Sequence, residues 1–135
     1  MTIETILGYK TIAVVGISDD PTRPSYFVAS FMEAHGYTII PVNPKLTEWE
    51  GKKCYPDLPS IPMNVDIVDI FRPSEAVPPI VDEAIAIKAK VVWMQEGIVN
   101  EEAAAKARKA GIEVVMDRCM KKEYAKIYPP SFVKK

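Results

Sequence analysis

The sequence has 135 residues, of which 48% are hydrophobic and 26% are charged, and its formal net charge is −1. This length suits one domain with a substantial core, and the balanced charge gives no electrostatic case for binding nucleic acid. No apolar run approaches the roughly 20 residues that span a bilayer, and the first residues do not form a signal peptide. We therefore expect a cytoplasmic protein without a membrane partner. Cys54 and Cys119 are too few for a disulfide framework or a metal cluster.

The first third of the chain predicts two strands and two helices. Residues 2–7 predict a short helix, and the β-branched apolar run 11–15 predicts a strand buried on both faces. Gly16 ends this strand. Apolar side chains at helical spacing over 25–32 predict a helix, and residues 37–42 predict the second strand.

The middle of the chain is less regular. Residues 46–64 contain three prolines and no clear period, which predicts a loop with one or two short turns. Alternation over 65–71 places Asp66 and Ile67 on opposite faces and predicts a third strand that is partly exposed. A helix is expected over 74–88, capped by the serine at its start.

The last third completes an alternating pattern. Residues 90–94 and 113–116 predict the fourth and fifth strands, with a helix over 101–110 between them that Asn100 caps. One further turn of helix is expected in residues 117–135. Strands alternating with helices predict an α/β fold, here one Rossmann-like domain over 1–135 with a doubly wound parallel sheet of five strands. We expect the strand order 3-2-1-4-5.

In such sheets, ligands bind beyond the carboxyl ends of the strands. The predicted strand ends are followed by cations, amide and hydroxyl groups, an aromatic ring and a thiol. These residues include Gly16, Ser18, Arg23, Asn43, Pro44, Lys45, Phe71, Arg72, Gln95 and Cys119. Together they suit a phosphorylated ligand with a flat ring.

The loop after the first strand does not carry the three glycines of the dinucleotide fingerprint, because Ser18 follows Gly16 at the next small position. The N-terminus of the helix that follows can bind a phosphate, and Arg23 would add positive charge there. Asp19 and Asp20 would repel such a ligand unless they cap backbone N–H groups. The residues alone leave a phosphate site and a purely structural turn about equally open.

The end of the second strand bears on the kind of nucleotide. Rossmann domains that bind NAD usually carry an acidic residue there, whereas this chain has Asn43, Pro44 and Lys45. A lysine at this place favours a phosphate. This leaves NADP and coenzyme A (CoA), both of which carry an additional ribose phosphate.

Five stretches resemble motifs of the small CoA-binding domain family, which is similar to the N-terminal domain of the succinyl-CoA synthetase alpha subunit. The stretches are 13–18, 23–26, 41–44, 93–97 and 116–119, and the resemblance runs from about Tyr9 to Glu123. It implies a Rossmann-like fold with CoA lying across the strand ends.

The resemblance also implies which residues contact each part of CoA. The pyrophosphate is expected at Gly16, Ser18 and Arg23, and the ribose phosphate near Asn43, Pro44 and Lys45. Adenine is expected near Phe71, Arg72 and Val77, and pantetheine near Met94 and Gln95. The matching motifs add Ile17, Ser25, Tyr26 and Cys119 to the cofactor-binding set.

The synthetase carries its phosphorylated histidine in a second domain, whereas the one histidine here, His35, is expected as a solvated residue at a helix end. We therefore expect a protein that binds CoA or acyl-CoA, without complete catalytic machinery, rather than an enzyme. It could form a homo-oligomer or serve a partner enzyme. The alternatives are an NADP(H)-binding enzyme or redox-sensing module, and an interaction module with a vestigial pocket.

Two side chains have competing interpretations. Cys119 could form a mixed disulfide with the CoA thiol, although cysteines are commonly small core residues. Trp93 is expected in the core rather than as a stacking platform, because it lies inside a buried strand.

Overall fold

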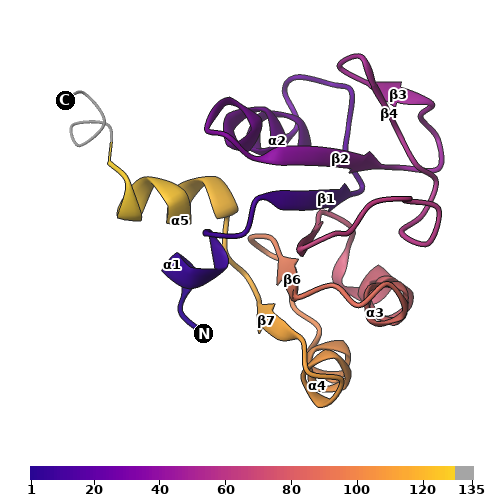
Figure 1. Cartoon of the computed structure of the whole chain (residues 1–135), viewed down its shortest axis with the longest axis vertical. Coiled ribbons are helices and arrows are strands. Elements are labelled where there is room, and N and C mark those ends of the chain that lie inside the picture. Colours follow the sequence, from indigo (N-terminus) through magenta and orange to yellow (C-terminus); the bar gives the residue numbers. More distant parts are fainter. Residues whose placement is uncertain (130–135) are drawn as a thin grey trace.

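The computed structural model describes residues 1–129 of the chain. The strands are β1 (Thr11–Val15), β2 (Thr38–Val42), β3 (Glu48–Trp49), β4 (Lys52–Lys53), β5 (Ile67–Ile70), β6 (Val91–Met94) and β7 (Glu113–Val115). The helices are α1 (Ile3–Ile6), α2 (Pro24–Ala34), α3 (Val77–Ala86), α4 (Glu101–Lys109) and α5 (Met120–Ile127), with a 3-10 turn, η1, at Ser74–Ala76. The predicted α/β architecture with a five-stranded parallel sheet is confirmed (Figure 1).

The order of the strands differs from the prediction. The sheet runs β2-β1-β5-β6-β7, so the third predicted strand, β5, pairs with β1 and not with β2. Counted along the chain, the five sheet strands have the order 2-1-3-4-5. β2 therefore forms an edge, and this suits Pro41, which has no N–H to donate. Beyond β2, Tyr55 forms a parallel bridge with Val42.

Helices cover both faces of the sheet. Alternate residues of β1 point to opposite sides: Ala13 and Val15 pack in a core with α3 and α4, whereas Ile12 and Val14 pack with α1, α2 and α5. Figure 1 shows α3 and α4 together on one side, and the other three helices on the opposite side. The expectation that Trp93 belongs to the core is confirmed, since its side chain is fully buried.

The alternation over 65–71 predicted a partly exposed third strand, but within that stretch only Asp66 and Phe71, just outside β5, are half-buried. All four residues of β5 are buried, because the strand lies at the centre of the sheet under helices on both faces. Asp69 is only 1% exposed, and its Oδ1 has no hydrogen-bond partner among residues 1–129. Burial raises the pKa of this carboxyl group well above its ordinary value.

Of the two helix caps predicted from the sequence in this part of the chain, one is confirmed and one is wrong. Asn100 caps α4 as predicted, accepting a hydrogen bond from the Ala103 N–H at 2.9 Å. Ser74 caps no helix, because its hydroxyl accepts from the Val99 N–H at 3.0 Å. The predicted loop over 46–64 contains the short antiparallel hairpin β3–β4, and the single turn expected near the C-terminus is an eight-residue helix, α5.

Candidate functional site

A cleft of about 770 Å³ opens at the carboxyl edge of the sheet, on the side that α2 and α5 cover. Its floor includes Gly16, Phe71 and Gln95, which follow β1, β5 and β6 directly. The cleft lies where β1 borders β5. The connection after β1 leads to α2 on one face of the sheet, and the connection after β5 leads to α3 on the other face. Sheets of this kind bind ligands at such a point.

Most of the sequence-predicted site residues line this cleft. Those at its β1 and β2 end are Gly16, Ile17, Ser18, Arg23, Ser25, Asn43 and Lys45. Those from the other loops are Phe71, Arg72, Gln95 and Cys119. The structure thus brings together residues from five separate loops.

Four predicted residues lie elsewhere. Val77 and Met94 are fully buried in the core beneath α3 and α4, so neither can contact a ligand in the cleft. Pro44 is exposed but does not line the cleft. Tyr26 also lies outside the lining, where its hydroxyl donates to a carboxylate oxygen of Glu50.

The loop between β1 and α2 is held in place by three contacts. The backbone N–H of Ser18 donates to Ser25 Oγ at 3.0 Å, and the Ser18 carbonyl accepts from Trp49 Nε1 at 2.9 Å. Asn43 Nδ2 donates to the Ile17 carbonyl at 2.8 Å. Because Asn43 Oδ1 also accepts from the Lys45 N–H at 2.8 Å, both halves of this amide position backbone. Asn43 therefore shapes the cleft from its wall.

The N-terminus of α2 faces the cleft without a side-chain cap. Arg23 occupies the N-cap position and makes no capping hydrogen bond, and Pro24 begins the helix. The unpaired N–H groups of a first turn and the helix dipole both favour an anion at such a place. An anion in the cleft would thus take the role that a capping side chain has elsewhere.

The two acidic residues of this loop differ in their surroundings. Asp20 accepts hydrogen bonds from the N–H and hydroxyl of Thr22, at 3.0 and 2.8 Å, and these hold the pKa of Asp20 below its ordinary value. Asp20 therefore stabilises its own turn. Asp19 lines the cleft.

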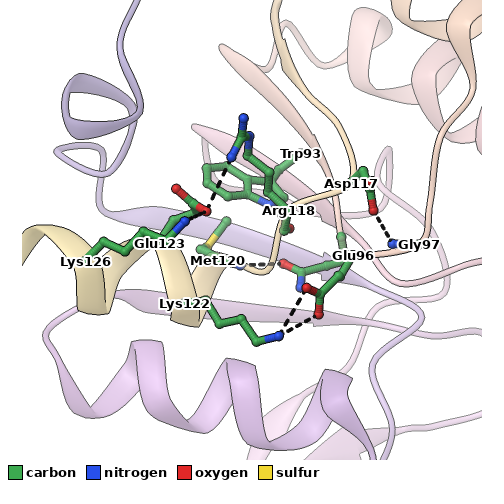
Figure 2. Close-up of polar contacts among 10 residues, drawn as sticks. Trp93, Glu96, Gly97, Asp117, Arg118, Met120, Lys122, Glu123 and Lys126 are labelled. Atoms are coloured by element: carbon green, nitrogen blue, oxygen red, sulfur yellow. Dashed lines mark hydrogen bonds and ion pairs between the residues drawn. The ribbon is translucent and has the colours of Figure 1, made fainter.

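Charge is distributed unevenly along the cleft. Arg23, Lys45 and Arg72 are cationic side chains at the β1, β2 and β5 end, and none forms an ion pair within residues 1–129. At the other end, Lys122 Nζ lies 3.0 Å from Glu96 Oε1 (Figure 2). The hydrogen bond and charge of Glu96 raise the pKa of the Lys122 ammonium group. Among the described residues, the cations of the cleft that form no ion pair are therefore confined to one end, where Asp19 also lines the wall.

The β6–β7 end of the cleft is braced by side chains that bind backbone (Figure 2). Trp93 Nε1 donates to the Arg118 carbonyl at 2.7 Å, and the Gly97 N–H donates to Asp117 Oδ1 at 2.7 Å. The Met120 N–H donates to Gln95 Oε1 at 3.2 Å. Cys119 is half-buried between these contacts, at the N-cap of α5.

Several residues of the cleft escaped sequence reasoning. Trp49 supports the loop between β1 and α2 from a stretch without any period, so only the presence of a tryptophan in a loop could have singled it out. Lys122 and Phe27 line the walls because α5 and α2 are oriented in particular ways, and no sequence signal marks them. Ile98 closes the β6 side and is 8% exposed.

His35 is exposed at the end of α2, outside the cleft, with Nδ1 2.7 Å from the Phe31 carbonyl oxygen. Within residues 1–129, no three His, Cys, Asp or Glu side chains gather in a way that could hold a metal ion. None of the helices described is long and apolar enough to cross a membrane.

Comparisons with known proteins agree with this geometry. The protein YneT of Bacillus subtilis (strain 168) is 45% identical over 122 residues, which cover 90% of each chain. A solved structure of a protein from Pyrococcus horikoshii OT3 superimposes with a TM-score of 0.89 at 42% identity, covering 93% of this chain and 92% of that chain. An acetate–CoA ligase (ADP-forming) of Archaeoglobus fulgidus is 28% identical over 128 residues, and the match covers 87% of this chain but 19% of that ligase. Residues 10–125 match the family described as the CoA binding domain, and the chain therefore belongs to this family.

Proposed function

We propose that the cleft binds coenzyme A or its thioesters, and that the protein acts as a CoA-binding module without complete catalytic machinery of its own. The observation that carries the proposal is the group of three cations, Arg23, Lys45 and Arg72, which have no carboxylate partner among residues 1–129 and lie at one end of the cleft. CoA concentrates its negative charge in a pyrophosphate and a ribose phosphate at one end of the molecule. Its other end is a neutral thiol.

This charge distribution orients the ligand. The pyrophosphate would lie at the uncapped N-terminus of α2, with Arg23 beside it, and Lys45 would meet the ribose phosphate. The pantetheine arm would then run over Phe71 towards Gln95 and Cys119. The matching relatives that are ligases are named for reactions that use CoA, and this supports the choice of ligand. A partner enzyme would supply any chemistry on the bound thioester.

Calorimetric titration with CoA, dephospho-CoA, NADH and NADPH tests the proposal. We expect CoA to bind most tightly and to raise the melting temperature, because a ligand that binds only the native state stabilises it. Stronger binding of NADPH than of CoA would instead support the alternative, an NADP(H)-binding enzyme or redox-sensing module.

Substitution of Arg23 tests the site itself. Arg23→Ala removes a charge-assisted contact, so the dissociation constant for CoA should rise about tenfold to a hundredfold. The stability of the free protein should stay the same, because Arg23 is exposed and forms no ion pair among the described residues. Arg108→Ala, in α4 and outside the cleft lining, is the matched control. An unchanged dissociation constant for Arg23→Ala would show that Arg23 is an ordinary surface charge.

A further inference from the structure

Gln95 is a buried amide at the end of the cleft where the neutral end of CoA would lie. Its side chain is only 4% exposed, yet it forms part of the cleft lining. Its Oε1 accepts a hydrogen bond from the Met120 N–H at 3.2 Å. This contact ties Gln95 to the first residue of α5 and so places it next to Cys119, the preceding residue.

The chemistry of this contact fixes the orientation of the amide. A backbone N–H can donate only to the oxygen of the side-chain amide, so the NH₂ group of Gln95 must point away from Met120. This NH₂ group makes no hydrogen bond to any residue in the range 1–129. Gln95 Nε2 is not among the fully buried polar atoms of residues 1–129 that lack a partner, so it is open to the cleft. The NH₂ group of Gln95 is therefore a donor available to a ligand.

The neighbouring backbone supports the same kind of ligand atom. Cys119 is the N-cap of α5 but provides no side-chain cap, and α5 has eight residues. The N–H groups at the start of a helix favour an oxygen with partial negative charge. Ile98 adds an apolar surface to this end of the cleft, where the Glu96–Lys122 ion pair also lies. A carbonyl oxygen with a short carbon chain attached fits this combination better than a thiol does.

We propose that Gln95 donates a hydrogen bond to the carbonyl oxygen of an acyl-CoA thioester, so that the cleft prefers acyl-CoA to free CoA. The inference rests on the proposed function, which puts the phosphates at the opposite end of the cleft. An acyl thioester presents a carbonyl acceptor beside its sulfur, whereas free CoA presents only a thiol, which is a weak acceptor. Because the side-chain oxygen of Gln95 accepts a hydrogen bond from α5, the side-chain nitrogen is available to donate a hydrogen bond to the ligand.

The test compares ligands that differ only at the carbonyl. Acetyl-CoA, S-ethyl-CoA and free CoA are titrated by calorimetry against the wild type and Gln95→Glu. The wild type should bind acetyl-CoA about 2- to 12-fold more tightly than S-ethyl-CoA, which is the effect of one neutral hydrogen bond. Gln95→Glu keeps an oxygen for the Met120 N–H but loses the donor. The ratio of the two dissociation constants should therefore fall to about one in this variant.

Asn64→Asp is the matched control, since it makes the same exchange of amide for carboxylate on an exposed loop away from the cleft. It should keep the wild-type ratio. A carboxylate at this buried position costs stability, so Gln95→Glu should melt at a lower temperature than the wild type. A single cooperative melting transition without ligand shows that the variant is folded. A ratio that persists in Gln95→Glu, or a wild type without preference, would overturn the inference and leave Gln95 as a support for α5. If none of the three ligands binds, the proposed function itself fails.

Discussion

Arg72 lies against Gly16, so closely that a Cβ atom on Gly16 would stand 3.1 Å from Arg72 Cδ. The contact exists because β1 and β5 are neighbours, which brings the residues after them together at the cleft floor. Gly16 also has a φ of +86°, in the left-handed region that side chains disfavour. A side chain at position 16 would therefore be unfavourable for two reasons, the left-handed φ and the close approach of Arg72.

Gly16→Ala should affect both stability and ligand binding. The left-handed φ costs a residue with a side chain about 1–2 kcal/mol of unfolding free energy. The Arg72 side chain must also shift by a few tenths of an ångström at the cleft floor, so the affinity for CoA should fall. Urea denaturation and calorimetry measure the two effects. Gly36→Ala is the control: its φ is +96°, but a Cβ atom there would have no neighbour within 4 Å, so stability should fall without a change in affinity. Unchanged CoA affinity in Gly16→Ala would show that Arg72 does not contact the ligand.

Lys45→Ala should weaken CoA more than dephospho-CoA, because only CoA carries the ribose phosphate. The side chain is exposed, so we expect a loss of about tenfold for CoA, the lower end for a charge-assisted contact, and a smaller effect at high salt. Titrations at two salt concentrations measure both. Lys109→Ala in α4 should change neither affinity. Equal losses for the two ligands would place Lys45 away from the ribose phosphate.

Asp69→Asn should change how stability depends on pH. Burial raises the pKa of Asp69 well above its ordinary value of 3.8, so the folded state keeps a proton that the unfolded state releases. The wild type must therefore lose stability as the pH rises above about 4, until the folded-state pKa is passed. The difference in unfolding free energy between Asp69→Asn and the wild type should grow in favour of the variant as the pH rises above about 4. Glu75→Gln, at an exposed carboxylate, is the control. Parallel pH curves for Asp69→Asn and the wild type would mean that the Asp69 carboxyl titrates alike in both states.

Cys119 should form a mixed disulfide when the protein meets CoA disulfide. Its thiolate would attack one sulfur of the disulfide, forming a bond between Cys119 and CoA and releasing the second CoA as a thiolate. Intact mass should show one CoA adduct on the wild type, absent in Cys119→Ser and retained in Cys54→Ser. Cys54 is the matched control because it is 4% exposed and burial raises the pKa of its thiol. An adduct that follows Cys54, or no adduct at all, would make Cys119 a structural residue.

The elements could be predicted from the sequence because each carries its own local signal. The apolar run 11–15 and the Asn100 cap needed no knowledge of the rest of the chain. The pairing of strands has no such signal: β2 and β5 are both apolar, and only the packed structure shows that β2 lies at the edge. The alternation of Asp66 and Ile67 suggested a partly exposed strand, whereas the central position of β5 buries all four of its residues.

The candidate site could likewise be predicted only in part from the sequence. Residues that directly follow strands, such as Gly16 and Gln95, could be placed at the cleft because parallel strands end at a common edge. Met94 could not, since one residue of offset turns a side chain to the other face of the sheet, and Val77 likewise packs in the core. Lys122 depends on the orientation of α5, which no pattern in the sequence encodes.

Each of the two tryptophans holds a carbonyl at one end of the cleft. Trp49 Nε1 binds the Ser18 carbonyl beside the cations, and Trp93 Nε1 binds the Arg118 carbonyl beside Cys119. Both indoles are at most 1% exposed, so quenchers in solution reach neither of them in the folded protein. The protein therefore contains two tryptophan fluorophores, one at each end of the cleft. Single replacements of Trp49 or Trp93 by phenylalanine would let the emission spectrum report on the phosphate end and the thiol end separately.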